Sequence, residues 1–197
     1  MEVKPVLALP EGLELSGLEQ VDEVLVITVA STQSAPCCPL CGVAARRVHS
    51  RYMRRVAELP CGGQQVRLLL KVRKCFCEEN TCPRTIFVER LAPFIDPHGR
   101  VTRRLFQVVQ VIGLATGGRL GVRVTDRIGI QTSRQTILRR ILALPTEPAG
   151  QVIELGVDDF SFRRGRTFGT ILVDLSSHQV VDLLPEGSVE SASAWMQ

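Results

Sequence analysis

Alternating apolar and basic residues predict a β-hairpin in the first half of the chain. Residues 64–74 alternate with a period of two, which is typical of a half-buried strand with one basic face. Residues 51–59 are predicted to be its antiparallel partner, joined through the turn Pro60-Cys61-Gly62-Gly63. A separate apolar run, residues 23–30, predicts one strand in an otherwise irregular start. In the second strand of the hairpin, the predicted inward residues are Val66, Leu68, Leu70 and Val72, and the outward ones are Arg67, Lys71 and Arg73.

The hydrophobic period changes to that of a helix after Val101. Apolar residues recur every three or four positions until Gly117-Gly118, where the first helix is predicted to end. A second, short helix is predicted over residues 120–127. Ser133 is predicted to cap a third helix that runs to Leu144, before Pro145. In this third helix we expect Ile137, Leu138, Ile141 and Leu142 to face inward, and Arg134, Gln135, Arg139 and Arg140 to face outward.

Three apolar runs in residues 152–184 predict three further strands, after a linker at residues 145–150. The first run is predicted to end at Asp158-Asp159, and the second to turn at Ser176-Ser177. An aspartate at the end of a strand is common in solvated turns. It is also the arrangement by which a metal-dependent nuclease presents a carboxylate to divalent ions. The pattern alone leaves both interpretations open.

Charge is strongly segregated along these elements. Residues 1–37 carry a net charge of −5, residues 38–150 a net charge of +13 and residues 151–197 a net charge of −4. A basic centre between acidic ends favours a polyanionic partner such as nucleic acid, against the alternative of a solvated Arg-rich surface. No apolar run approaches the roughly 18 residues that a membrane span requires, and the N-terminus lacks the pattern of a signal peptide. We therefore expect a cytoplasmic protein with no membrane partner.

Two pairs of cysteines predict a zinc site. In the cytoplasm, cysteines are metal ligands or free thiols more often than disulfides. Cys38 and Cys41 lie in one tight turn, Cys77 and Cys82 follow the predicted hairpin, and two such pairs are typical of a closed, structural, four-thiolate zinc site. A β-rich unit of this size has a small core, so we expect the metal to supply much of its folding energy.

The choice of ligands stays open at this point, because Cys37 and Cys75 adjoin the two pairs. His49 is another possible ligand, but its neighbours are basic, and we interpret it as a surface or DNA-facing residue. Cys61 is expected to be a free thiol. The alternative to a zinc site is a set of buried, reduced thiols.

A helix, a turn containing Gly129, and a capped helix with Arg and Gln near its start together predict a helix-turn-helix. The third helix would enter the major groove, where Arg suits guanine and Gln suits adenine. The alternative is a three-helix unit that serves only packing. The candidate DNA-binding residues are Ser133, Arg134, Gln135, Thr136, Arg139 and Arg140.

Three segments resemble one group of bacterial insertion-sequence transposases. They are CPLCG with FCEENTCPRTIF (residues 38–42 and 76–87), GIQTSRQTILRRILALP (129–145) and GVDDFSFRRGRTFGTILVDL (156–175). Members of that group carry an N-terminal zinc-binding domain, a helix-turn-helix and a ribonuclease-H-like DDE catalytic domain. The resemblance favours Cys38, Cys41, Cys77 and Cys82 as the zinc ligands. It also implies that Asp158 is the first catalytic carboxylate, whereas Asp174 and Asp182 are interpreted as acids on the strand surface.

The resemblance implies an α+β chain in four parts. These are an N-terminal extension with one strand (1–36), a zinc-binding β domain (37–95), a helix-turn-helix domain (96–147) and the first three strands of a ribonuclease-H-like α/β domain (152–197). The implied function is DNA transposition, with structural Zn²⁺, with Mg²⁺ in the complete family enzyme, and with double-stranded DNA at the element ends as partner. A second copy or a full-length transposase would be a further partner, at the bacterial nucleoid.

The family's second catalytic Asp and its final Glu would lie beyond Gln197. We therefore expect a truncated copy without the full catalytic triad, inactive by itself. One alternative is a non-catalytic, zinc-containing DNA-binding protein that regulates or inhibits transposition. Another is a zinc-stabilised interaction module without a DNA role.

Overall fold

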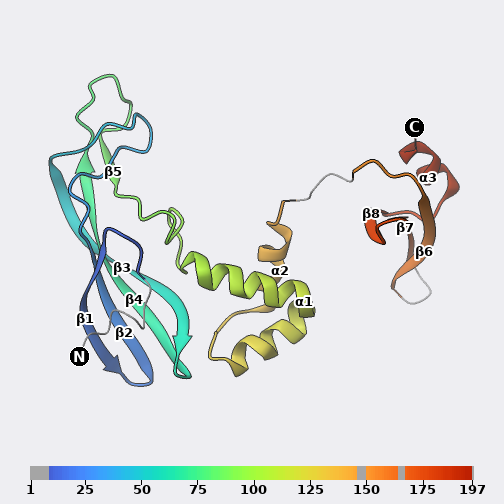
Figure 1. Ribbon diagram of the computed structural model, residues 1–197, viewed down its shortest axis with the longest axis horizontal. Helices are drawn as coiled ribbons and strands as arrows, with labels where there is room; N and C mark the ends of the chain where they lie inside the picture. Colours follow the sequence, from blue (N-terminus) through green and yellow to red (C-terminus); the bar gives the residue numbers. More distant parts are fainter. Residues whose placement is uncertain (1–8, 146–149, 164–166, 197) are drawn as a thin grey trace. The chain divides into compact units, whose positions relative to one another are not determined.

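The computed structural model describes residues 9–145, 150–163 and 167–196, and the chain divides into two compact units, Met1–Leu144 and Pro145–Gln197. The described residues form sheets and helices, so the chain is an α+β protein (Figure 1). The strands are β1 (Leu13–Val21), β2 (Val24–Ser31), β3 (Val48–Cys61), β4 (Gln64–Phe76), β5 (Ile86–Val88), β6 (Leu155–Arg163), β7 (Thr167–Asp174) and β8 (Gln179–Leu184). The helices are α1 (Arg103–Arg127), α2 (Arg134–Leu142) and α3 (Val189–Trp195).

The first unit is built around the long β3–β4 hairpin, which confirms the predicted pairing. The two strands pair antiparallel with Val56 opposite Leu68, and they turn at Gly62 and Gly63, both of which have positive φ angles. In this turn the left-handed backbone favours glycine because a side chain would be strained there. The sheet order is β1-β2-β4-β3, with β5 paired to the end of β4 (Figure 1).

The expectation of a single N-terminal strand is wrong. β1 precedes β2 and pairs with it antiparallel, with a bulge between Leu15 and Gly17. The alternation of β1 is interrupted at this bulge, which is why the sequence pattern did not reveal the strand. β2 in turn pairs in parallel with β4. Both N-terminal strands therefore belong to the same sheet as the hairpin and do not form a separate extension.

One face of this sheet carries the core of the first unit. Leu68, Leu70 and Val72 are almost fully buried, as the alternation predicted, and the segment after β5 covers them with Phe94 and Ile95. On the other face Arg67 and Lys71 are exposed, also as predicted.

Arg73 lies on the same face, opposite Arg51, but its side chain is only 17% exposed. Its guanidinium binds the buried carboxylate of Glu89 at 2.7 Å and donates to the carbonyl of Gln33 at 2.7 Å. The partner Glu89 lies directly after β5, so only the folded arrangement brings it beside Arg73.

The helices of the first unit follow the predicted breaks closely. α1 begins after Thr102, whose hydroxyl accepts from the Leu105 amide, and it is kinked at Gly117, where φ is 70°. α2 is capped by Ser133 as predicted, but it ends at Leu142, whose side chain is 83% exposed and does not face inward.

Glycines allow α1 and α2 to pack closely. A Cβ atom added at Gly113 would lie 2.6 Å from Cγ2 of Ile137, which is too close for any real contact. Ile137 itself is fully buried in a cluster with Leu105, Val109 and Ile130. The apolar face of α2 is therefore fixed against α1, which leaves its opposite face free to meet a ligand.

By length and composition alone α1 could cross a membrane, which is a weak indication because core helices of soluble proteins meet the same criterion. Its apolar residues Leu105 and Val109 are buried within the helical pair, and the kink at Gly117 interrupts it. Packing thus accounts for part of its apolar character.

The second unit is an antiparallel sheet of order β6-β7-β8 followed by α3. The predicted three strands are present, but β6 does not end at Asp158. It continues to Arg163 because Asp158 pairs with Ile171 and Asp159 with Thr170, and the register shifts only later, between Ser161 and Arg163. The Arg-rich segment 163–166, which from the sequence alone is expected to be a turn able to touch a phosphate backbone, falls mainly on residues 164–166, which lie outside the described residues.

Candidate metal centre and DNA-binding surface

Two backbone turns position the four candidate zinc ligands. In the first turn the Gly42 amide donates to the Cys38 carbonyl at 2.9 Å, and Gly42 has a positive φ of 75°. In the second turn the Cys82 amide donates to the carbonyl of Glu79 at 3.1 Å. The β3–β4 hairpin and β5 hold the two turns side by side, although more than 30 residues separate them in the sequence.

The four sulfurs form one compact cluster. The Sγ atoms of Cys38, Cys41, Cys77 and Cys82 all lie within 4.8 Å of one another. The Sγ atoms of Cys38 and Cys82 are 4.0 Å apart, and those of Cys41 and Cys77 are 3.5 Å apart. Sulfurs bound to one tetrahedral zinc at about 2.3 Å lie about 3.8 Å from each other. The cluster therefore fits a structural zinc ion.

The electrostatics of the cluster suit a bound cation. A hydrogen bond from the backbone of Cys41 lowers the pKa of the Cys38 thiol to about 6, despite the opposing effect of burial. The Glu79 amide lowers the pKa of Cys77, but burial and the hydrogen bonds with the other sulfurs together raise it to about 12. Four adjacent thiolates need a compensating positive charge, and a dication provides it.

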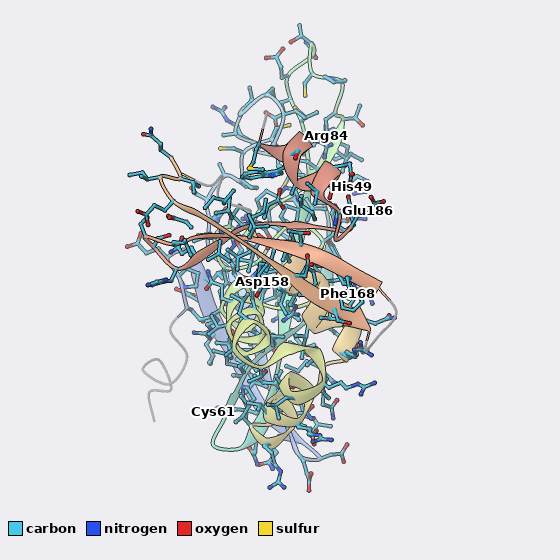
Figure 2. The ribbon with its side chains drawn as sticks, turned by 90° about the vertical axis from the view of Figure 1, so that its right-hand side faces the viewer. His49, Cys61, Arg84, Asp158, Phe168 and Glu186 are labelled. Atoms are coloured by element: carbon cyan, nitrogen blue, oxygen red, sulfur yellow. The ribbon has the colours of Figure 1, made fainter. Side chains whose placement is uncertain are left out.

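The neighbouring alternative ligands lie outside this cluster. Cys75 is buried beside Phe87, where desolvation raises its thiol pKa, and Cys37 is exposed. The ring of His49 lies edge-on to Phe76 at 5.0 Å, and its Nδ1 is 2.9 Å from the hydroxyl oxygen of Ser50. Cys61 lies at the opposite end of β3 from His49 (Figure 2). Among the described residues, the four-cysteine cluster is the only group of three or more potential metal ligands.

The predicted base-reading residues mostly lie on the free side of α2. Ser133 caps the helix by accepting from the Thr136 amide at 3.2 Å. Arg134, Gln135 and Arg139 are exposed, whereas Thr136 is half-buried. The first turn of α2 therefore presents one amide and one guanidinium group to solvent, and Arg139 presents a second guanidinium one turn further along.

Arg140 does not face outward as expected. Its guanidinium lies 4.9 Å from the centre of the Phe106 ring on α1, and burial lowers its pKa. The Gln110 side chain also donates to the Arg140 carbonyl at 2.7 Å. Arg140 thus serves the packing between the two helices, because the turn of α2 directs it back toward α1.

Three residues at the junction of sheet and helix were not singled out by the sequence. The carboxylate of Glu58, at the end of β3, accepts from the Thr102 hydroxyl at 2.9 Å and from Arg104 Nε at 2.8 Å. Glu58 is buried, so this polar cluster joins β3 to the start of α1. A Thr directly before a helical pattern is a sequence signal for the N-cap of that helix. The contacts of Glu58 could not be predicted from the sequence, because only the folded chain brings Glu58 beside Thr102 and Arg104.

Among the residues that the structure describes, Asp158 does not lie in a cluster of carboxylates. Its side chain is exposed and accepts from the amide of Asp159 at 2.8 Å. Asp159 points to the other face of the sheet, where its Oδ1 accepts from Thr170 at 3.4 Å. Within the described residues, Asp158 belongs to no group of three possible metal ligands.

Asp174 and Asp182 are engaged locally, in keeping with their interpretation as strand-surface acids. Hydrogen bonds from Ser176 and Ser177 lower the pKa of Asp174 to about 2. Asp182 accepts from the indole Nε1 of Trp195 at 2.8 Å, which ties α3 to β8.

Comparison with known proteins supports the resemblance to transposases. Residues 34–82 match the family described as the zinc-finger of transposase IS204/IS1001/IS1096/IS1165. In an alignment of 193 positions that covers 94% of its length, the chain is 30% identical to the transposase for insertion sequence element IS1001 of Bordetella parapertussis. It spans 46% of the length of that relative. No solved structure matches the chain. The chain is thus similar to an insertion-sequence transposase over most of its own length, and its residues 34–82 are similar to the zinc fingers of such transposases.

Proposed function

We propose that this protein binds duplex DNA at the ends of an insertion sequence during DNA transposition. The observation that carries the proposal is the 30% identity to a transposase over 94% of the chain, because the matched length includes the zinc finger, the helical pair and the last three strands. The net charge of +13 over residues 38–150 supports a polyanionic partner for the centre of the chain.

In this proposal the zinc has a structural role. Cys38, Cys41, Cys77 and Cys82 would fill all four positions of a tetrahedral ion, so no position remains for a substrate or a water molecule. The ion would link the turn before β3 to the turn after β4. It would thereby fix the end of the hairpin, where the buried apolar cluster is small: Ala45, Phe87 and two cysteines, with Val48 and two further cysteines packed against them.

The helical pair, residues 96–147, is proposed to act as a helix-turn-helix with α2 as the recognition helix. Its apolar side is anchored through Ile137, while Gln135 and Arg139 project from its free side. Arg134 is exposed at the start of the helix, with the stem of its side chain against Gly118 of α1. Arg and Gln can each form two hydrogen bonds to a purine edge in the major groove. Arg140 is not part of this reading surface, since it lies against Phe106.

The second unit is proposed to be the start of a ribonuclease-H-like domain with Asp158 as its first carboxylate. Three antiparallel strands followed by a helix support this assignment. Divalent-metal catalysis of strand transfer requires two ions clamped by several carboxylates. Because Asp158 has no such companions among the described residues, we propose that this chain alone neither cleaves nor joins DNA, and that Mg²⁺ acts only in the complete family enzyme.

The same isolation of Asp158 favours a second candidate function. A chain that binds element ends without cutting them would compete with a full-length transposase, or join it in a mixed oligomer. It would then act as a regulator or inhibitor of transposition.

The test is a binding measurement with the purified chain and fluorescent duplexes. One duplex carries the terminal sequence of the element from which the gene comes, and the other is a shuffled sequence of the same composition. We expect tighter binding to the element end and a steep loss of affinity as salt rises, because bound counterions are released from DNA. Equal affinity for both duplexes would contradict recognition of the element end, and affinity that is indifferent to salt would contradict DNA binding as proposed.

A further inference from the structure

The exposed face of the β3–β4 hairpin carries an ordered row of positive charges, which we call the basic strip. It consists of Arg51 and Arg55 on β3 and Arg67 and Lys71 on β4, all of them exposed. Side chains on one face of a strand occur at every second residue, so all four lie on the face opposite the core. The strip is separate from α2 and from the zinc ligands.

The register places one charge of the strip at each successive cross-strand pair. Met53 is opposite Lys71, Arg55 is opposite Leu69, and Ala57 is opposite Arg67. The charges of the strip therefore alternate between the two strands, and no two members of the strip lie directly opposite each other. Arg51 lies opposite Arg73, whose charge is paired with Glu89. Successive pairs on one face are separated by about 6.7 Å, so the strip extends over about 20 Å.

No acid in the described residues neutralises the strip. The ion pairs of this part of the chain involve Arg73, Arg103 and Arg104, and none involves a residue of the strip. Two acids on the same face, Glu14 and Glu19, lie on β1, which β2 separates from the hairpin. The strip is thus an uncompensated row of charge whose mutual repulsion works against folding.

The strip also continues toward the helical pair. Arg67 lines a small cavity together with Gly129 and Gln131, which belong to the turn before α2. Leu59, two residues beyond Ala57, packs in the same apolar cluster as Leu105 at the start of α1. One end of the strip therefore adjoins the element that is proposed to read bases.

We propose that the basic strip is a second DNA-binding surface, which holds backbone phosphates of the duplex and does so regardless of base sequence. Duplex DNA carries one negative charge per about 1.7 Å, so a length of 20 Å offers roughly 12 phosphates to four cations. Because the phosphates are so closely spaced, each long Arg or Lys side chain of the strip can reach one without adopting a fixed conformation. An acidic protein surface would instead need carboxylates spaced to match the strip. This inference rests on the proposed DNA binding and adds a surface outside the helix-turn-helix.

The experiment measures the affinity of the full chain for a duplex of arbitrary sequence, about 30 base pairs and roughly 100 Å long, between low and moderate salt. Each cation that contacts a phosphate contributes about 0.9 to the slope of log affinity against log salt. Arg55→Gln with Lys71→Gln should therefore reduce the slope by about 1.8, and the fourfold Gln variant by about 3.6. Arg55→Lys with Arg67→Lys keeps the charge and should keep the slope.

A matched control removes the same charge away from the strip. Arg46 is exposed in the turn before β3. Arg46→Gln should change the slope by less than half as much as Arg55→Gln alone. Zinc content and the thermal unfolding transition confirm that all variants are folded.

Three outcomes would overturn the inference. If the wild-type chain binds duplex DNA and the strip variants keep its slope, or lose no more of it than the control, the strip is not a phosphate-binding surface, while the proposed function stands. Strip-dependent binding that is tighter to single-stranded RNA of equal length assigns the strip to RNA instead. If no duplex binds, the proposed function fails together with the inference. Support requires, in addition, that strip variants weaken binding to element-end and arbitrary duplexes by the same factor.

Discussion

Arg73 and Glu89 form an ion pair at 2.7 Å in which the carboxylate is fully buried and the guanidinium side chain is 17% exposed. Glu89 also accepts from the backbone amide of Arg73 at 2.7 Å. The pair therefore joins the end of β4 to the segment after β5, and the same guanidinium reaches the chain after β2 through Gln33. One charged side chain thus links three segments of the first unit.

Glu89→Ala is expected to lower the free energy of unfolding by about 3–5 kcal/mol, because it leaves a largely buried guanidinium without its counter-charge. Chemical denaturation monitored by circular dichroism measures the change. Asp96→Ala is the matched control, since it breaks the Arg103–Asp96 pair, in which both side chains are 52% exposed. That control should cost less than about 1 kcal/mol. Equal effects of the two substitutions would contradict the importance of the buried pair.

Cys41→Ser and Cys77→Ser are each expected to lower zinc content well below the about one ion per chain expected for the wild type. Cys37→Ser and Cys61→Ser are the controls and should retain the ion, because neither residue belongs to the cluster. Elemental analysis of protein purified without added metal gives the stoichiometry. Full zinc content in a Cys41→Ser, Cys77→Ser double variant would rule out the site.

Zinc should be released as the pH falls. The folded structure depresses the pKa of Cys38 to about 6, below its ordinary value. The thiolate is therefore favoured above that pH, and protonation competes with the metal as pH falls through it. Titration with a chromophoric chelator from pH 8 to pH 5 should show affinity decreasing steadily toward acid. An affinity that is flat over this range would mean that thiolates do not hold the ion.

Arg134→Ala and Gln135→Ala should each reduce discrimination between element-end and shuffled duplexes by about 1–3 kcal/mol. Gln107→Ala, an exposed position on α1, serves as the control and should leave discrimination unchanged. Competition binding at fixed salt measures the ratio of affinities. If the discrimination between the two duplexes survives both substitutions on α2, another element of the protein must read the bases.

Gly113→Ala should destabilise the helical pair. The new Cβ would lie 2.6 Å from Ile137 Cγ2, and such overpacking typically costs about 1–3 kcal/mol, which exceeds the gain of up to about 1 kcal/mol in helix propensity. Gly150→Ala, where a Cβ meets nothing within 4 Å, should be close to neutral. Thermal unfolding compares the two, and a stabilised Gly113→Ala protein would contradict the packing of α1 on α2.

Incubation of the chain with Mg²⁺ or Mn²⁺ and supercoiled DNA that carries the element ends should produce no nicks. Strand cleavage requires two ions about 3.5–4 Å apart, and Asp158 has no companion carboxylates for such a clamp among the described residues. Asp158→Ala should behave identically in an agarose-gel assay. Nicking by the wild type that disappears in Asp158→Ala would show that an oligomer, or acids such as Asp174 and Asp182, can complete a site.

Local sequence patterns predicted the local structure well. The alternation in β4 identified its buried residues because, in a strand with one buried face, every second side chain must point to that face. Ser133 marked the start of α2 because helix N-caps strongly favour Ser. Gly117 marked the kink of α1 because left-handed backbone strongly favours Gly. The cysteine pairs predicted the cluster because their spacing restricts the geometry of the turns.

Features that depend on distant partners were not predictable. The pairing of Arg73 with Glu89 arises from strand register, and Arg140 faces Phe106 because of how α2 packs on α1. Likewise, β6 extends past Asp158 because β7 supplies a ladder, which outweighs the low strand preference of Asp. In each case a tertiary contact prevailed over a local tendency.

The parallel pairing of β2 with β4 determines the order in which this sheet can form during synthesis. The β1–β2 hairpin leaves the ribosome first, but its partner strand follows only after about 40 further residues have been made. Until then the β2 edge that will receive β4 has unpaired amides and carbonyls, and Ile27 and Val29 lack their apolar cover. The finger matched at residues 34–82 excludes β1 and β2. If the finger were made without β1 and β2, the edge of β4 that pairs with β2 would have unpaired amides and carbonyls beside exposed apolar side chains. Such a fragment is expected to aggregate.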